Sequence, residues 1–495
     1  MAIGPPGKGP LTLRAPSDLC QRVSDVKHLQ RLTLADLANL AAEALDTPMH
    51  QGALGILDGS SLLDQGGRVR IEAIRTHIAA RLDRVPELRR ILFLTGPLQG
   101  RPLWVDDPEF SIENHVLVAR LPAPGGESQA LRFAEGMMGS LMDRSQPMWQ
   151  MWFLEGYGQG KIGLFLKLHH VFADGQGILK IVGLLFDLEP GVVDTRRASW
   201  TAAPPPSPRA LAIDNLARKG RLMARATRRL AHPVVLARSL GVTARAIRAT
   251  IQEGRGAPRT SLNVPVGPAR RVATMTLPLA EVKAAAHTER VKLNDVFMDL
   301  IAGGLREVLI ERRTAVHGLR IRASMAVAQK APGESELVGN HVGTMIVPLP
   351  IDVEDVRERL AMIAAATINA KARQRSAVPQ TLMAALAATG LTRFFIRRQH
   401  LVNVLVTNLA GPQFPIYVAG ARLESVVPIP PIAGNVTVAF AAFSYDGRLT
   451  LAVHADAEAW PDLDALMHGM ERAWMGLRSS QPIVPAGMGS VALSA

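Results

Sequence analysis

Three consecutive prolines, inside the stretch TAAPPPSPR at residues 201–209, divide the chain more sharply than any other feature of its sequence. Proline has a fixed φ and no backbone N–H, so such a run belongs neither in a helix interior nor in a central strand. At 495 residues the chain is long enough for two or three domains. We therefore predict an N-terminal domain over 1–200, a linker and helical bridge over 201–262, and a C-terminal domain over 263–495.

Both halves mix strand and helix patterns in a similar order. Apolar residues recur at helical spacing over 71–82 and over 294–308. Runs rich in β-forming residues, on either side of a glycine-containing turn, predict one hairpin over 151–170 and another over 435–456. Each hairpin leads through a histidine and an aspartate into a helix pattern. We expect two similar α/β domains with one active site between them, because only the first copy carries a double histidine.

Composition narrows the class of protein. The single cysteine, Cys20, excludes an intramolecular disulfide and a cysteine-rich metal site, and suits a reducing cytoplasm. The first residues lack the apolar segment of a signal peptide, and no apolar stretch approaches the ~20 residues of a membrane span. The net charge of +13 is concentrated at 209–259, where twelve Lys or Arg accompany two acids. Few aromatic residues and no nucleic-acid-binding motif lie there, so we do not expect a nucleic-acid partner.

The stretch LFLKLHHVFADGQGILKIV (164–182) ends an apolar strand pattern with His169 and His170, and Asp174 opens the next helix pattern. Neighbouring strand residues point to opposite faces, so two adjacent histidines rarely bind one metal ion. Either both histidines pack at a strand end, or one points into a cleft as a general base, for which an imidazole pKa near ~6.5 is suited. Asp174 can cap the following helix or pair with a cation.

Residues 169–175, HHVFADG, match the HHxxxDG motif of the CoA-dependent acyltransferase superfamily, which condensation domains of peptide synthetases share. From about Leu32 to about Arg472 the chain resembles bacterial wax ester synthase/diacylglycerol acyltransferases. The stretches that carry this resemblance, in the order seen in that family, are PLWVDDPEFSIENHV (102–116), LMDRSQPMWQMWFLEG (141–156), LNVPVGPARRVA (262–273), LNDVFMDLIAGGLREVL (293–309), VGNHVGTMIVPLP (338–350), TNLAGPQFPIYVAGARL (407–423) and SYDGRLTLAVHAD (444–456). The resemblance implies two chloramphenicol-acetyltransferase-like α/β sandwich domains joined by the basic helical bridge, with the active site in a tunnel between them.

On matching positions, the resemblance makes His170 the catalytic base, with His169 and Asp174 as orienting residues and Gly175 giving room at the mouth of the site. The family's PLW and Asn-Asp elements, implied to bind substrate and to complete the active site, match Pro102, Leu103, Trp104, Asn294 and Asp295. Plain core packing would also account for the tryptophan. A helix N-cap would also account for the asparagine, because Asn is preferred there.

The chain departs from the family at two places. Residues 325–330 are MAVAQK where relatives have PVS before an arginine, so Ala326 replaces a proline and Lys330 an arginine. Residues 407–412 are TNLAGP where relatives often have SNVPGP. Neither departure touches the histidine motif. Both are expected to reshape the acceptor or CoA channel.

The implied reaction is direct acyl transfer from a fatty acyl-CoA co-substrate to the hydroxyl of diacylglycerol or a long-chain alcohol, without a metal or other cofactor. His170 would remove the alcohol proton, and Asn294 or a backbone N–H would stabilise the oxyanion. No acyl-enzyme is needed, and Cys20 lies far from every motif. The alternatives are a condensation-type acyltransferase with carrier-bound donors and a weakly active homologue that binds lipid surfaces.

The basic bridge supports two interpretations. Its arginines alternate with apolar residues, namely Leu222, Met223, Leu230, Val234 and Leu236. This pattern suits an interfacial helix whose cations meet anionic headgroups, and predicts a cytoplasmic protein attached peripherally to the inner membrane or to lipid droplets. The alternative is a solvated interdomain helix whose arginines pair with acids of the two domains.

Overall fold

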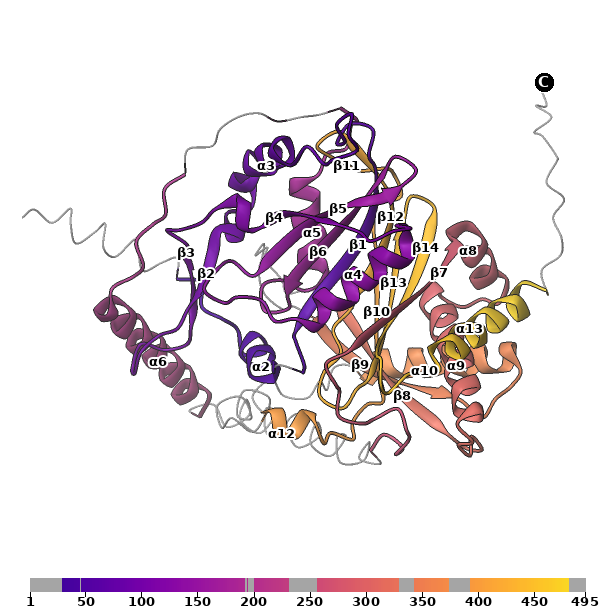
Figure 1. The fold of residues 1–495 in the computed structure, drawn as a ribbon. Helices are drawn as coiled ribbons and strands as arrows, with labels where there is room; N and C mark the ends of the chain where they lie inside the picture. The colour runs from indigo at the N-terminus through magenta and orange to yellow at the C-terminus, as the bar shows by residue number, and fades with distance from the viewer. Residues whose placement is uncertain are drawn as a thin grey trace, which may run out of the picture.

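Two six-stranded sheets form the body of the molecule (Figure 1). The computed structural model describes residues 29–44, 46–191, 194, 200–230, 256–328, 342–373 and 392–479. The first sheet has the strand order β11 (Tyr417–Val418), β12 (Ala421–Ile429), β1 (His50–Asp58), β6 (Lys161–His169), β5 (Trp149–Gly158) and β4 (Val116–Arg120). The second has the order β7 (Arg270–Pro278), β14 (Arg448–Asp456), β13 (Val438–Tyr445), β10 (Val404–Ala410), β8 (Arg320–Ala328) and β9 (Val342–Pro350). A separate ribbon pairs β2 (Arg90–Phe93) with β3 (Leu103–Asp106).

Helices pack on both sheets. Those of the first half are α2 (Leu34–Ala42), α3 (Ile71–Ala79), α4 (Glu127–Gly139) and α5 (Gly175–Leu185), with short 3₁₀ helices at Leu82–Arg84, Pro86–Arg89 and Ile112–Asn114. Those that follow are α6 (Pro208–Leu230), α8 (Leu279–Thr288), α9 (Leu293–Glu311), α10 (Val356–Arg373), α12 (Thr392–Ile396) and α13 (Leu463–Arg478). In the described part of the chain, no helix is both long and apolar enough to cross a membrane.

The predicted helix near residues 294–308 is confirmed as α9, whose apolar face is fully buried in the core of the second half. This helix packs closely against α13 because Gly304 has no side chain. A Cβ there would lie 2.7 Å from the backbone oxygen of Leu466. The helix predicted at 71–82 is likewise present as α3.

The two sheets repeat one pairing scheme. Both predicted hairpins are confirmed as the antiparallel pairs β5–β6 and β13–β14. In the first sheet β1 flanks the hairpin antiparallel and β4 flanks it parallel; in the second, β7 and β10 do the same. The β13–β14 turn has positive φ at Asp446 (43°) and Gly447 (78°), as a tight hairpin turn requires. The fold therefore contains two similar α/β units, as predicted.

The second half also completes the first sheet. Strand β12 lies antiparallel to β1, with Gly52 opposite Ile429, and β11 forms the outer edge. Helix α4 and β12 then meet β7 and β14 in a small shared core between the halves. The domain boundaries predicted at 200 and 263 stay predictions. They did not anticipate that β11 and β12 of the second half complete the sheet of the first half.

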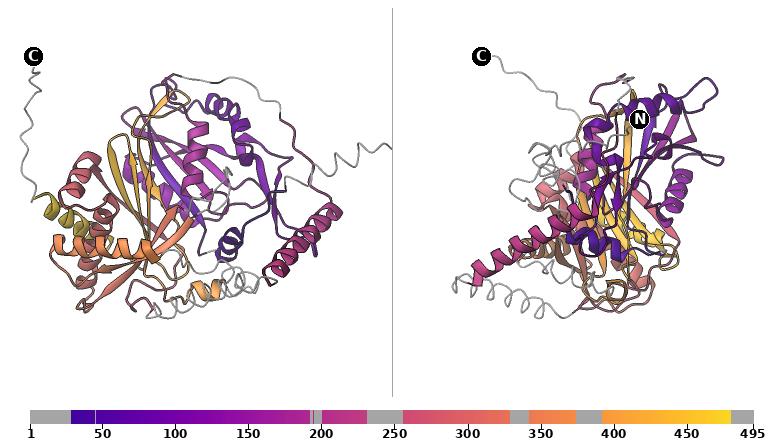
Figure 2. Two further views of the ribbon diagram at one scale, coloured as in Figure 1. Left: turned by 180° about the vertical axis from the view of Figure 1, so that it is seen from behind. Right: turned by 90° about the vertical axis from the view of Figure 1, so that its left-hand side faces the viewer.

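Most of the described part of the predicted linker and bridge is α6, which is helical over 208–230. Leu211 is fully buried against Leu103 and Val105 of the β2–β3 ribbon. Beyond this anchor the helix runs out from the body (Figure 2). Most of the predicted bridge beyond residue 230, including Val234 and Leu236, lies outside the described residues, as does Cys20.

A buried ion pair stabilises the place where the edge strand β11 of the second half contacts the first half. Asp187 exchanges two backbone hydrogen bonds of 2.8 Å with Tyr417, and its carboxylate accepts a 2.7 Å bond from the guanidinium of Arg81, which is 2% exposed. By contrast, the Lys161–Glu424 pair between β6 and β12 is about one-third exposed on both sides.

These two pairs predict different stabilities for two variants. Asp187→Ala leaves a buried arginine without its main partner, so we expect the free energy of unfolding to fall by about 3–5 kcal/mol. Glu424→Ala removes an exposed pair and should cost less than about 1 kcal/mol. Denaturant unfolding of the three proteins measures both values. Equal losses in the two variants would contradict the assignment of Asp187 as a structural brace.

Candidate active site

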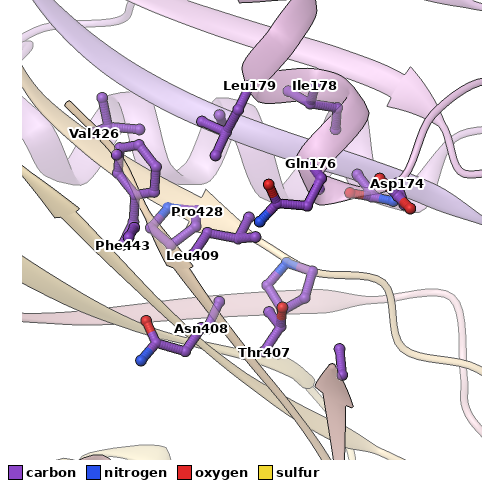
Figure 3. A pocket seen from close by; sticks show the side chains of 18 of the residues that line it. Asp174, Gln176, Ile178, Leu179, Thr407, Asn408, Leu409, Val426, Pro428 and Phe443 are labelled. Atoms are coloured by element: carbon purple, nitrogen blue, oxygen red, sulfur yellow. The ribbon is translucent and has the colours of Figure 1, made fainter. Parts of the chain in front are cut away.

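A cavity of about 830 Å³ lies between the two halves. Helix α5 and strands β1, β6 and β12 of the first sheet line the cavity on one side, and strands β8, β9, β10 and β13 of the second sheet line it on the other. In Figure 3, Asp174, Gln176 and Leu179 face Thr407, Asn408 and Leu409 across this space. Most of the lining is apolar. The polar side chains that line it include those of Asn39, Gln51, His170, Asp174, Gln176, Asn294, Ser324, Thr344, Lys371, Thr407 and Asn408.

The two adjacent histidines point in opposite directions. His170 lines the cavity, whereas His169, at the end of β6, is 1% exposed and faces the interior of the first half. Backbone bonds fix both residues: the His169 N–H donates to the Met148 carbonyl (3.1 Å) and the His170 N–H to the Met49 carbonyl (2.7 Å). This is the alternation expected at a strand end.

A buried carboxylate, Glu43 at the end of α2, holds His169. The His169 Nδ1 accepts a 3.0 Å bond from the Val171 N–H, so in the neutral ring the proton is on Nε2, which donates to Glu43 Oε1 at 3.0 Å. Glu43 also accepts bonds from the Met49 N–H and from Arg144. Burial alone would raise the pKa of Glu43, but the bonds from His169 and Arg144 outweigh it and hold that pKa below its usual range.

The loop after His170 is held by its own side chains and by the opposite half. Asp174 is the N-cap of α5 and accepts a 2.9 Å bond from the Gly177 N–H, and Gln51 donates to the Ala173 carbonyl at 3.1 Å. At Gly175 a Cβ would lie 2.7 Å from Cδ1 of Leu409 in β10. The absence of a side chain at Gly175 therefore lets the two halves approach each other at the motif.

The Asn-Asp element lies in the first turn of α9. Asn294 lines the cavity as the second residue of the helix, so it is not the N-cap; that position belongs to Lys292. Asp295 points elsewhere: it is 3% exposed, does not line the cavity, and accepts a 2.9 Å bond from the Lys292 N–H. The Asn294 side-chain oxygen accepts a close hydrogen bond from the side-chain amide of Asn408.

The PLW element does not line the cavity. Pro102 accepts a backbone bond from Leu32, and Leu103 is fully buried beneath α6. Trp104 is 7% exposed and packs edge-to-face on Phe172 of the histidine motif, with 5.6 Å between ring centroids. For Trp104 this packing agrees with the alternative that the sequence left open, whereas a role of the element in substrate binding stays a prediction. Trp104 supports the motif loop from behind.

One cluster in the described part of the chain has metal-ligand composition. Ligand atoms of Glu43, His50 and His169 lie within 4.8 Å of one another. However, the His169 nitrogen that faces the cluster carries the proton, and a metal would need that lone pair. Arg144, which forms an ion pair with Glu43, and the buried Lys167 are both positively charged. They would repel a metal dication bound at this cluster. The chemistry of the donor set therefore does not suit a metal ion.

Several residues of the site have no clear signal in the sequence. Glu43 lies 126 residues before His169 and Gln51 lies 122 before Ala173, so neither belongs to a local motif. Asn408 lies in the TNLAGP element, which belongs to a stretch that resembles the family and departs from it locally, but no role was predicted for Asn408 itself. All six residues of that element, and Ala326 of the other departure, line the cavity. Lys330 lies outside the described residues.

Comparisons with known proteins agree with this architecture. A solved wax ester synthase/diacylglycerol acyltransferase from Marinobacter aquaeolei VT8 superposes with a TM-score of 0.63 at 22% identity, covering 91% of this chain and 99% of its own. A condensation domain of the calcium-dependent antibiotic synthetase superposes with a TM-score of 0.59 at 15% identity, covering 91% and 96%. These likenesses define the fold class, a two-unit α/β sandwich of the chloramphenicol-acetyltransferase kind.

Sequence matches define the family. The model of the wax ester synthase/diacylglycerol acyltransferase catalytic domain matches residues 32–297, and that of the C-terminal domain of the same family matches residues 338–478. A Mycobacterium tuberculosis protein named "probable diacylglycerol O-acyltransferase" is 29% identical over 465 residues, covering 90% of this chain and 95% of its own. The chain belongs to the wax ester synthase/diacylglycerol acyltransferase family, and is accordingly an acyltransferase.

The buried tether predicts an effect on turnover. In Glu43→Gln one amide oxygen cannot serve His169, the Met49 N–H and Arg144 together, and the new NH₂ faces donors. We expect kcat to fall about 10²-fold through misplacement of the motif loop, in a protein that remains folded. Arg144→Gln keeps the bond between Glu43 and His169 and should lose much less. A larger loss in Arg144→Gln than in Glu43→Gln would contradict the tether.

Proposed function

We propose that the protein transfers a fatty acyl group from acyl-CoA directly to the hydroxyl of diacylglycerol or a long-chain alcohol. The observation that carries the proposal is His170, turned into a largely apolar cavity while its neighbour is tethered away from it. Its imidazole removes the alcohol proton as the oxygen attacks the thioester carbonyl. The Asn294 side chain donates to the oxyanion, and the imidazolium returns the proton to the departing CoA thiolate.

The environment of His170 suits a base. Burial lowers the pKa of His170 below its ordinary value, so the ring is neutral at physiological pH. Asp174 lines the same cavity, but its carboxylate is occupied as the cap of α5. Because the base is active only when neutral, acidification should remove activity as His170 becomes protonated, and the lowered pKa moves that loss to a more acidic pH than for an ordinary histidine.

His170→Ala should lower kcat by about 10²–10⁴-fold while leaving the fold intact, as judged by circular dichroism and thermal unfolding. In the parent protein the rate of ester formation should be level near pH 7 and should fall with a midpoint below about 6.5. A folded His170→Ala protein with parental turnover would refute the general-base role.

One product assay identifies both the alcohol that accepts the acyl group and the form of the acyl donor. Palmitoyl-CoA is offered with hexadecanol and with diacylglycerol separately, and the esters are resolved. We expect ester with at least one acceptor, with no stable acyl-protein by mass spectrometry when donor is given alone. Transfer from a carrier-bound acyl group but not from acyl-CoA would instead favour the condensation-type alternative, which shares the fold.

We also propose that the enzyme works at a lipid surface and that α6 is the surface element. Ile213, Leu216 and Met223 are 57%, 73% and 70% exposed, and their spacing of three and seven residues places them on one face of the helix. Leu211 and Asn215 occupy the opposite, buried face. The apolar face therefore points away from the body.

Charge favours an anionic surface. Among the described side chains, the cations of α6 (Arg209, Arg218, Lys219 and Arg221) form no ion pair with an acid, which disfavours the interpretation of α6 as a strut paired to both domains. Apolar side chains flanked by cations suit a helix lying at the headgroups of anionic lipids.

Vesicle binding tests this role. Leu216→Glu with Met223→Glu should weaken binding to phosphatidylglycerol vesicles about 10²-fold or more, since full burial of each side chain contributes roughly 1.5–3 kcal/mol. Turnover on vesicle-held diacylglycerol should fall with it, and turnover on a short soluble alcohol should not. Met475→Glu changes a methionine of similar exposure (60%) on α13 and serves as the control. Parental vesicle binding by the double variant would refute the proposal.

A further inference from the structure

We infer that Asn408 is a positioning residue that fixes the side-chain amide of Asn294 as a hydrogen-bond donor toward the reacting carbonyl. This inference rests on the proposed function and deepens it at the same site. The two asparagines come from different elements, the first turn of α9 and the strand β10, and both line the cavity. Their side chains are joined by one close hydrogen bond.

The direction of that bond decides what Asn294 can offer a substrate. A side-chain amide has one carbonyl oxygen and one NH₂ group, and rotation by 180° exchanges them at nearly the same positions. The Asn408 NH₂ donates to the Asn294 oxygen. The Asn294 NH₂ makes no hydrogen bond to the residues that the structure describes, so its donors are available to a ligand. An oxyanion requires donors and is repelled by a carbonyl oxygen.

The elements that carry the pair are rigid. Asn408 lies opposite Ala442 in the parallel β10–β13 pair, whose strand β13 is buried along its whole length. Asn294 lies within the capped first turn, in which the Asp295 carboxylate accepts a 2.9 Å bond from the Lys292 N–H. The backbone positions of both residues are therefore fixed, and the hydrogen bond between the side chains restrains the rotation of the two amides. The pair therefore sets an orientation before substrate binds, which is the condition for effective stabilisation of a developing charge.

Asn408→Asp tests this inference most sharply. A carboxylate of nearly the same shape cannot donate, and instead accepts from the Asn294 NH₂, which turns the Asn294 oxygen toward the cavity. Loss of one oxyanion donor typically costs about 10²–10³-fold in kcat. We expect a fall of that size with KM for acyl-CoA unchanged, and a smaller fall in Asn408→Ala, where Asn294 is merely freed. Asn408→Ala should cause no further loss in an Asn294→Ala background.

Gln399→Glu provides the matched control. Gln399 donates to Asn435 at 2.7 Å in another amide pair of the same half, and it does not line the cavity. This variant makes the same amide-to-acid change and should keep parental kcat. If Asn408→Asp does not fold, the double-mutant cycle of Asn294→Ala and Asn408→Ala tests the positioning role by itself.

The outcomes separate this inference from the proposed function. Additive losses in the cycle, or parental kcat in folded Asn408→Asp while Asn294→Ala is impaired, would overturn only the positioning role. Parental kcat in Asn294→Ala while His170→Ala is inactive would overturn the oxyanion role of Asn294 and this inference with it. Non-additive losses confined to kcat would support the inference.

Discussion

The hydrogen bond between Glu43 and His169 is the interaction on which the site depends. A strand can present only one of two adjacent side chains to each face, so holding His169 inward commits His170 to the cavity. Glu43 remains ionised inside the protein because Arg144 and the Met49 N–H share its charge. The inward histidine thus acts through geometry, since it sets the direction of its neighbour without touching a substrate.

Local patterns in the sequence were sufficient for the parts of this design that are local. The hairpins, the helix α9 and the Asp174 cap follow from periodicity and turn chemistry within about twenty residues, and they are present as predicted. The tether to Glu43 and the completion of the first sheet by β11 and β12 join residues more than one hundred positions apart. A periodic pattern relates only residues that are close in sequence, so these contacts could be identified only from the folded structure.

For Asn294, Trp104 and the apolar residues of α6, the structure shows surroundings that differ from the first interpretation of the sequence. Asn is common at helix N-caps, but α9 begins one residue before Asn294, which leaves its side chain free to face the cavity. Trp104 was weighed as a substrate contact, yet its ring supports Phe172. Likewise the apolar residues that face outward on α6 include Ile213 and Leu216, in the segment before the arginine-rich stretch. In each case the burial and direction of the side chain depend on neighbouring elements, which a local sequence pattern does not describe.

The two similar units differ at the histidine of their hairpin strands, and the proposed mechanism uses only the histidine of the first unit. The second copy also carries a histidine on its hairpin strand, but His454 is 1% exposed, its Nδ1 bonds the Pro430 carbonyl at 2.5 Å, and burial lowers its pKa to about 4. Pro430 lines the cavity, so this histidine supports the wall and cannot reach a hydroxyl. In the proposed mechanism the first copy supplies the proton acceptor, while the second supplies the amides of Asn294 and Asn408 on the facing wall. A thioester held between these walls would have its attacking alcohol on one side and its oxyanion donor on the other, which neither copy could provide alone.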